Sequence, residues 1–126
     1  YYSSFQTIEI VSKKKSTEEL QKREEGQLIL KKIADADSVI LLDEKGKEFS
    51  SIEFSKFIEK HRLNSTKNIV FVIGGAYGFS EEVYKRANHK MSLSKMTFPH
   101  QLVRIIFAEQ LYRAFTILKR EKYHHE

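Results

Sequence analysis

The most informative segment of the sequence runs from Ser92 to Arg113 and reads SLSKMTFPHQLVRIIFAEQLYR. A short polar loop in it contains the chain's only proline, Pro99, and leads into a long helical segment. Proline suits the first residue of a helix, because the N–H that it lacks would have no partner there. We therefore expect a loop over Ser94–Phe98 and a helix that begins at Pro99.

The helix after Pro99 is apolar around most of its circumference. One stripe at helical spacing consists of Val103, Ile106, Phe107, Leu111, Ala114 and Leu118. A second set widens that stripe and consists of Leu102, Ile105, Tyr112 and Phe115. Because a surface helix needs an apolar face only about 100° wide, this helix has two apolar sides to cover. One side is expected to pack on a sheet, and the other predicts a partner subunit.

Four segments upstream of this helix have the composition of β-strands. Phe5–Val11 alternates apolar and polar residues, which predicts a half-covered strand. Ser38–Leu42 and Asn68–Ile73 are continuous apolar runs, which predict strands covered on both faces. Asp43–Lys47 consists of turn residues and is expected to end the second strand. His89–Leu93 is expected to be a short fourth strand.

A serine marks the expected start of each of the three upstream helices. Ser16 and Glu19 have the spacing of a capping box, and so do Ser50 and Glu53. The first helix is expected to end near residue 34. Ser80 precedes an acidic first turn and is expected to cap the third helix. Strands and helices then alternate along the chain, which predicts an α/β fold with a mostly parallel sheet and helices on its faces.

Composition narrows the class of protein. A chain of 126 residues with 40% apolar and 31% charged residues is expected to form a single domain, residues 1–126. The absence of cysteine excludes disulfides, a thiolate nucleophile and cysteine-ligated zinc, and it suits the cytoplasm. A net charge of +5 favours polyanionic partners such as RNA or DNA. No apolar run approaches the roughly 20 residues of a membrane span.

The glycine-rich segment Gly74–Gly78, which follows a predicted strand, is the first candidate for a ligand site. Glycine lets a ligand approach the backbone closely, and ligands in open α/β sheets bind at the carboxyl ends of the strands. A tight turn from strand to helix explains the same residues equally well. Ser80 is better explained as a helix cap than as a nucleophile, and the scattered histidines predict no metal site.

Four segments taken together resemble one family. They are GGAYGFS at residues 74–80, SLSKMTFPHQLVR at 92–104, AEQLYRA at 108–114 and YHHE at 123–126. At these separations they are similar to the ribosomal RNA large subunit methyltransferase H family of the SPOUT class. The resemblance implies a SPOUT-type α/β fold whose C-terminal trefoil knot runs from about Gly74 to the start of the last helix. It also implies that this chain lacks the family's N-terminal strand and helix.

The resemblance further implies an activity and its site. Family members transfer a methyl group from S-adenosyl-L-methionine to N3 of a pseudouridine in 23S rRNA. The cofactor pocket would consist of Leu42, Gly74, Leu93, Ser94, Lys95, Met96, Thr97 and Phe98. The candidates for orienting or deprotonating the base are Arg113, Tyr123 and His124, with His100 and Arg104 in support. An ion pair with Glu109 or with another helix is the alternative explanation of the two arginines.

The resemblance implies two partners, 23S rRNA in the ribosome and a second copy of the chain packed through the last helix. It implies neither DNA nor a membrane as a partner. RNA contacts are expected from basic residues of the C-terminal half: Lys85, Arg86, Lys90, Lys95, Arg104, Arg113, Lys119, Arg120 and Lys122. Two alternatives stay open: a non-catalytic RNA- or ribosome-binding module that keeps the SPOUT fold, and an unrelated nucleotide-binding enzyme that uses Gly74–Gly78.

Overall fold

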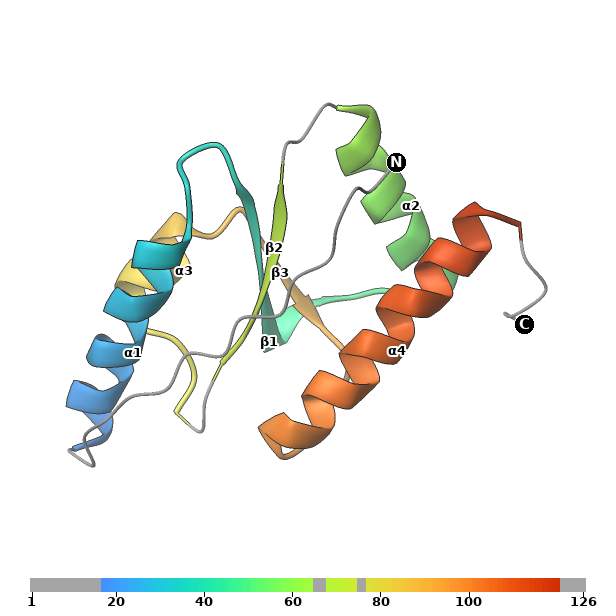
Figure 1. Cartoon of the computed structure of the whole chain (residues 1–126). Coiled ribbons are helices and arrows are strands. Elements are labelled where there is room, and N and C mark those ends of the chain that lie inside the picture. Colours follow the sequence, from blue (N-terminus) through green and yellow to red (C-terminus); the bar gives the residue numbers. More distant parts are fainter. Residues whose placement is uncertain (1–16, 65–67, 75–76, 121–126) are drawn as a thin grey trace.

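A computed structural model describes residues 17–64, 68–74 and 77–120 of the chain (Figure 1). The elements in chain order are α1 (Glu18–Lys32), β1 (Ser38–Glu48), α2 (Ser51–Leu63), β2 (Ile69–Ile73), α3 (Glu81–Arg86), β3 (His89–Ser92) and α4 (His100–Leu118). The strand predicted over Phe5–Val11 lies outside the described residues. The other predicted strands and all four predicted helices are present, so the α/β architecture is confirmed for the described part of the chain.

The three described strands form a parallel sheet in the order β2-β1-β3. Val39, Ile40 and Leu41 of the central strand β1 have no exposed surface, which confirms the prediction of a strand covered on both faces. Every residue of β2 is partly buried: Ile69, Phe71 and Ile73 pack against one core cluster and Val70 and Val72 against the other, so β2 is also covered on both faces, though less fully than β1. The difference follows from position, because β1 has a strand on each side and β2 lies outermost among the described strands.

Two layers of helices enclose the sheet (Figure 1). On one face Ile40 lies in a core cluster with residues of α2, β3 and α4: Phe54, Ile58, Met91, Phe107, Leu111 and Ala114. On the other face Val39 and Leu41 lie in a cluster with Ile29 of α1, with Val83 of α3 and with Phe79, which precedes α3. Successive residues of β1 therefore point to opposite layers, as the pleat of a strand requires.

The turn expected over Asp43–Lys47 is a bulge rather than the end of a strand. β1 continues to Glu48, and both Leu42 and Lys47 lie opposite Met91 of β3, so the ladder skips the residues between them. The Asp43 carboxylate accepts a hydrogen bond from the Lys45 backbone N–H at 2.9 Å. Gly46 approaches β3 so closely that a Cβ atom there would lie 2.6 Å from the Met91 backbone nitrogen. Turn residues therefore mark an insertion that leaves the ladder and rejoins it.

The serine caps of α2 and α3 are confirmed. At α2 the Glu53 N–H donates to Ser50 Oγ at 3.1 Å, and the Ser50 N–H donates to Glu53 Oε1 at 2.8 Å, which completes the capping box. At α3 the Val83 N–H donates to Ser80 Oγ at 3.4 Å. These bonds satisfy amides that have no partner inside their helix.

The starts of α1 and α4 differ from prediction by one residue. Thr17 caps α1 by accepting a hydrogen bond from the Leu20 N–H at 3.3 Å. The observed cap is therefore one residue later than the predicted cap Ser16, which lies outside the described residues. α1 ends at Lys32, earlier than predicted. Pro99 is the N-cap of α4 and not its first helical residue, because its carbonyl accepts from the Val103 N–H at 3.1 Å while its own backbone is not helical.

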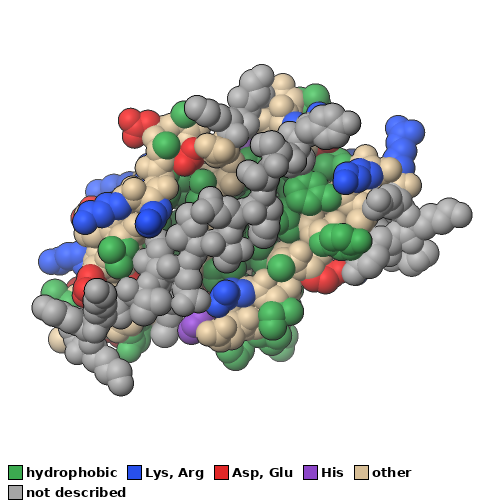
Figure 2. All heavy atoms as spheres, viewed as in Figure 1, with side chains coloured by type: hydrophobic (Ala, Val, Ile, Leu, Met, Phe, Trp, Pro, Cys, Tyr) green, Lys and Arg blue, Asp and Glu red, His purple; other side chains and the backbone are tan. Residues whose placement is uncertain are grey.

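Helix α4 has one buried and one exposed apolar side. Phe107, Leu111 and Ala114 are buried in the core. Three residues of the second side are exposed: Leu102 at 41%, Ile105 at 67% and Tyr112 at 57%. Phe115, predicted to belong to the same side, packs partly against the core instead. Figure 2 shows hydrophobic side chains at the surface along α4. Within the described ranges, no helix combines the length and the apolar composition that crossing a membrane requires.

Candidate functional site

The register of the sheet brings the predicted cofactor residues to one edge. Leu42 of β1 lies opposite Ile73 of β2 and Met91 of β3. Gly74 directly follows Ile73, and Leu93 is the first residue after β3. Since the three strands are parallel, Leu42, Gly74 and the start of the loop from Leu93 all lie at the carboxyl edge. Ligands of open α/β sheets bind at this edge.

Short hydrogen bonds shape the loop that leaves β3. The Ser92 hydroxyl donates to the Ser94 carbonyl at 2.8 Å, and the Met96 N–H donates to Ser94 Oγ at 3.0 Å. The Thr97 hydroxyl donates to the Glu44 carboxylate at 3.2 Å, which ties the loop to the bulge of β1. The predicted loop residues fall into an exposed group of Lys95, Met96 and Thr97 and a half-buried group of Leu93, Ser94 and Phe98.

Gly74 has a packing role beside its predicted ligand role. A Cβ atom at this position would lie 3.0 Å from Cζ of Phe79, closer than ordinary van der Waals contact. Phe79 is buried, and its ring meets the Tyr84 ring edge-on at 5.7 Å between centroids. Gly78 has φ of +81°, the left-handed backbone that glycine adopts without strain. The tight turn proposed as the alternative explanation of Gly74–Gly78 is therefore present at Gly78, whereas residues 75 and 76 lie outside the described residues.

Tyr84 and Asp43 form a contact that sequence patterns do not indicate. The Tyr84 hydroxyl donates to Asp43 Oδ2. Burial raises the pKa of Tyr84 to about 12, and the hydrogen bond to Asp43 and its negative charge add to the rise. The phenol therefore remains a neutral donor at physiological pH and links α3 to the bulge of β1. Asp43 and Tyr84 are 41 residues apart, so no local spacing reveals the contact.

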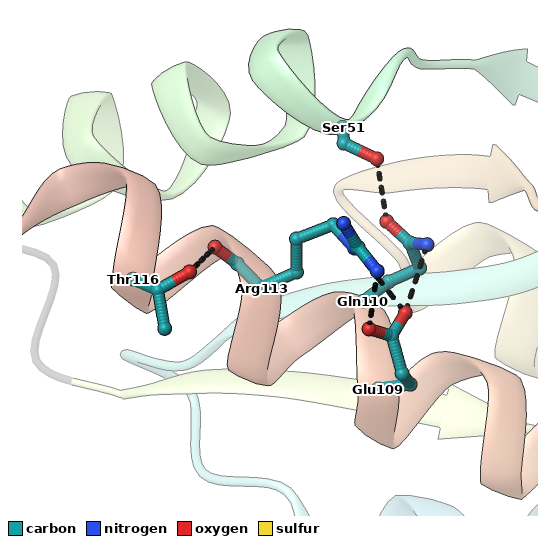
Figure 3. Close-up of polar contacts among 5 residues, drawn as sticks. All are labelled: Ser51, Glu109, Gln110, Arg113 and Thr116. Carbon is teal, nitrogen blue, oxygen red and sulfur yellow. Dashed lines mark hydrogen bonds and ion pairs between the residues drawn. The ribbon is translucent and has the colours of Figure 1, made fainter. Parts of the chain in front are cut away.

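Arg113 of α4 belongs to a polar network with the start of α2 (Figure 3). Its Nη2 lies 2.8 Å from Glu109 Oε2, which confirms the ion pair considered as an alternative. Glu109 Oε1 also accepts from Gln110 Nε2 at 3.1 Å, and the Ser51 hydroxyl donates to Gln110 Oε1 at 2.8 Å. The Thr116 hydroxyl donates to the Arg113 carbonyl at 2.7 Å. Sequence patterns missed Gln110 and Ser51, whose contact joins residues 59 positions apart.

A cavity of about 240 Å³ connects this network with the loop after β3. Its lining consists of Phe49, Ser50, Ser51, Phe54, Met91, Ser92, Leu93, Ile106 and Gln110. Leu93 belongs to the predicted cofactor loop, and Gln110 belongs to the network that holds Arg113. The lining includes neither Leu42 nor Gly74, so the cavity adjoins the predicted cofactor residues without coinciding with them.

Two of the four remaining catalytic and supporting candidates belong to the described part of the chain. His100 and Arg104 are exposed in the first turns of α4, and Arg104 Nη1 donates to Gln101 Oε1 at 3.4 Å. Arg104 thus contacts a neighbour on its own helix, and Arg113 forms the ion pair with Glu109. Tyr123 and His124 lie outside the described residues.

Among the basic residues predicted to contact RNA, Arg86 is engaged within the protein. Its Nη2 donates to the carbonyl oxygens of Ala34 at 2.9 Å and Asp37 at 3.0 Å, and its Nη1 donates to Asn88 at 3.2 Å. Arg86 thus closes the amino end of β1, opposite the candidate site. The exposed members of the predicted set are Lys85, Lys90, Lys95, Arg104, Lys119 and Arg120. Lys122 lies outside the described residues.

Known proteins resemble this chain over nearly its whole length. The family described as "Predicted SPOUT methyltransferase" matches residues 1–124. The "Ribosomal RNA large subunit methyltransferase H" of Christiangramia forsetii is 57% identical over 129 residues, which cover 99% of this chain and 82% of the relative. The protein of that name from Parabacteroides distasonis is 57% identical and covers 94% of this chain and 75% of the relative. The Cytophaga hutchinsonii protein of that name is 53% identical, with 99% and 82% covered.

These matches confirm the family indicated by the motifs, and they favour an enzyme over the non-catalytic alternative. The family profile spans the whole described sheet and its helices, and the relatives share more than half of the residues over most of both chains. The chain therefore belongs to the ribosomal RNA large subunit methyltransferase H family of SPOUT methyltransferases.

Proposed function

We propose that this protein transfers a methyl group from S-adenosyl-L-methionine to N3 of a pseudouridine in 23S rRNA of the large ribosomal subunit, in the cytoplasm. The observation that carries the proposal is the meeting of Leu42, Gly74 and the loop from Leu93 at the carboxyl edge of the sheet. The names of the relatives support large-subunit ribosomal RNA as the substrate class. The pseudouridine and its N3 atom are inferred from family membership.

The cofactor-binding residues in this proposal are Leu42, Gly74, Leu93, Ser94, Lys95, Met96, Thr97 and Phe98. The chemistry of this edge suits a molecule that has both an apolar ring and polar groups. Leu42 and Leu93 are half-buried against one core cluster, so they offer apolar surface, and the loop after them adds hydroxyls and backbone amides. When bound, S-adenosyl-L-methionine supplies an activated methyl group. By family membership the segment from Gly74 to the start of α4 is inferred to form the trefoil knot.

The chain's own task is to hold the base and to favour the loss of its N3 proton. The departing proton leaves negative charge on the base, and a fixed cation nearby stabilises that charge. Arg113 suits this task, because Glu109 holds its guanidinium in place through two hydrogen bonds. Tyr123 and His124 are the other residues assigned to orient or deprotonate the base.

The second apolar side of α4 supports a homodimer. Leu102, Ile105 and Tyr112 recur at intervals of three and seven residues, so they lie along one side of the helix. A two-fold dimer would cover this side and is the commonest oligomer among soluble proteins. In the proposed arrangement the C-terminal tail of one subunit completes the site of the other.

Calorimetric titration with S-adenosylhomocysteine tests the cofactor pocket. Gly74→Leu places a bulky side chain at the carboxyl edge and is expected to weaken binding at least tenfold. Because any Cβ atom there also presses on Phe79, the stability of the variant is measured in parallel. Gly26→Ala is the matched control, since its Cβ atom would press on Ser80 Oγ, between α1 and α3 and away from the pocket. Unchanged affinity in a folded Gly74→Leu protein would contradict the pocket.

Methyl transfer to ribosomal particles tests the substrate. Large subunits from a strain that lacks the modification are incubated with the protein and radioactive S-adenosyl-L-methionine, and the label is mapped on the RNA. The proposal predicts label at one pseudouridine of 23S rRNA and none on particles that already carry the modification. Cofactor binding without methyl transfer to either particle would favour the non-catalytic alternative.

A further inference from the structure

A second hollow of about 240 Å³ lies beside β3, outside the predicted cofactor site. Its lining consists of Lys47, Phe49, Phe57, Lys60, His89, Lys90 and Met91. These residues come from the end of β1, from α2, from β3 and, in the case of Phe49, from the link between β1 and α2. None of them belongs to the proposed cofactor or catalytic set, and Lys90 alone was among the expected RNA contacts.

The rim of this hollow is cationic. Lys47 and Lys60 are exposed, and neither has a carboxylate partner among the described residues. Glu59, the acidic neighbour of Lys60 in sequence, is paired with Arg62. Lys47 lies near enough to the Glu53 carboxylate to help lower its pKa, but neither lysine forms an ion pair with a described carboxylate, so an anion in the hollow would meet two positive charges.

Two lysines of the lining also lie over aromatic rings. The Lys47 ammonium lies 5.3 Å from the centroid of Phe49, which itself lines the hollow. The Lys90 ammonium lies 5.6 Å from the centroid of the Tyr84 ring on α3, and Tyr84 does not line the hollow. Because the Lys90 ammonium lies over a ring outside the lining, the charged rim is assigned to Lys47 and Lys60 alone.

The walls of the hollow are aromatic. The Phe57 ring lies 5.2 Å from Phe49 and 5.2 Å from His89 between centroids. His61 lies 4.4 Å from Phe57 and 5.4 Å from His89, and its Nδ1 is 3.0 Å from the Phe57 carbonyl. Burial lowers the pKa of His89, and the charges of His61 and Lys60 lower it further. His89 is therefore neutral at physiological pH and presents an aromatic ring rather than a third charge.

Aromatic walls beside unpaired lysines suit a nucleotide. A base stacks on aromatic rings, and a phosphate meets lysine, which is how proteins bind unpaired RNA. We infer that this hollow binds one unpaired nucleotide of the RNA substrate, with its base against Phe57 and His89 and its phosphate between Lys47 and Lys60. This inference rests on the proposed function for the identity of the RNA.

The position of the hollow indicates that it holds a nucleotide flanking the target. It shares Phe49 and Met91 with the cavity that reaches Leu93 and Gln110. Gln110 in turn contacts Glu109, the partner of Arg113. The hollow and that cavity are therefore neighbours, so the inferred nucleotide would flank the target base rather than be the target.

Binding of a short oligouridine at several salt concentrations tests the inference. The variant Lys47→Ala/Lys60→Ala is expected to bind about tenfold more weakly than the wild type. Its plot of log affinity against log salt concentration is expected to be less steep, by about 0.7 for each phosphate that the variant no longer neutralises. The matched control is Lys31→Ala/Lys56→Ala, which removes two exposed lysines from α1 and α2 outside the hollow. His89→Ala is expected to weaken binding about fivefold without a change in that slope, because it removes stacking and no charge.

The outcomes separate this inference from the proposed function. Equal affinities and equal slopes for the hollow variant and its control would overturn the nucleotide site. Uridine 5′-monophosphate provides a second arm: if it binds as tightly as oligouridine and displaces it, the ligand is a free mononucleotide and the RNA assignment is wrong. All variants are expected to keep wild-type affinity for S-adenosylhomocysteine. If the wild-type protein methylates no ribosomal RNA, the proposed function is wrong. The oligouridine titration would still show whether the hollow binds a nucleotide.

Discussion

Replacing Gly46 with alanine tests how the bulge of β1 is held against β3. The added Cβ atom would lie 2.6 Å from the Met91 nitrogen, 2.7 Å from the Lys90 carbonyl carbon and 2.8 Å from the Met91 carbonyl carbon. The first distance is 0.8 Å short of the 3.4 Å at which ordinary contact begins. All three atoms belong to the backbone of β3, so no side chain can rotate away, and the two strands must separate.

The expected loss of stability follows from that separation. Overpacking a core costs about 1–3 kcal/mol, and each ladder hydrogen bond that lengthens adds about 1 kcal/mol. Loss of the glycine's freedom in the unfolded chain offsets about 0.4–1 kcal/mol. For one lengthened bond the net free energy of unfolding is therefore expected to fall by about 1–4 kcal/mol, a large share of the roughly 5–15 kcal/mol that holds a domain together.

Urea unfolding followed by circular dichroism measures this change. With a slope of about 2 kcal/mol per molar urea, the midpoint is expected to fall by about 0.5–2 M. Gly74→Ala is the control, because its Cβ atom meets the Phe79 ring rather than a strand, and a ring tilts at a lower cost. A Gly46→Ala protein as stable as the wild type, or more stable, would show that the bulge has room for a side chain, since an open position would gain stability from alanine. The bulge also carries Glu44, which contacts Thr97, so weaker binding of S-adenosylhomocysteine is expected as well.

Three further predictions concern the surface and the titrating groups. Ile105→Glu is expected to sediment as a monomer and to transfer methyl groups poorly. Leu20→Glu, a change at an exposed apolar site on α1, is the control and is expected to leave the dimer intact. A dimeric Ile105→Glu protein would contradict the assigned interface. The pKa of His89 in the folded protein is lowered from 6.5, so the unfolded chain binds the proton more readily. The free energy of unfolding is therefore expected to fall as pH drops below about 6.5. His89→Gln is expected to make the dependence of stability on pH less steep in this range. Tyr84→Phe removes the donor to Asp43, so the phenol that titrates at about 12 should disappear from the ultraviolet titration and the free energy of unfolding should fall by about 1 kcal/mol.

Local chemistry made several elements predictable. The Ser50–Glu53 box and the Ser80 cap depend on hydrogen bonds that span three residues, so their spacing is visible in the chain. Burial of Val39, Ile40 and Leu41 follows from a continuous apolar run that no solvated strand would contain. The bulge after Leu42 was not predictable, because the same turn residues suit a strand end, and only pairing with β3 distinguishes the two.

The family, the caps of α2 and α3 and the excess of apolar surface on α4 could be predicted from the sequence, because motifs, capping and helical periodicity depend on residues close together in the chain. The link from Arg113 through Glu109 and Gln110 to Ser51 could be seen only in the folded protein, as could the hollow that Lys60 and His89 border. Those contacts depend on the parallel register of the strands and on the packing of α2 against α4. Register and packing are set by many weak contacts acting together, and no short stretch of sequence contains them.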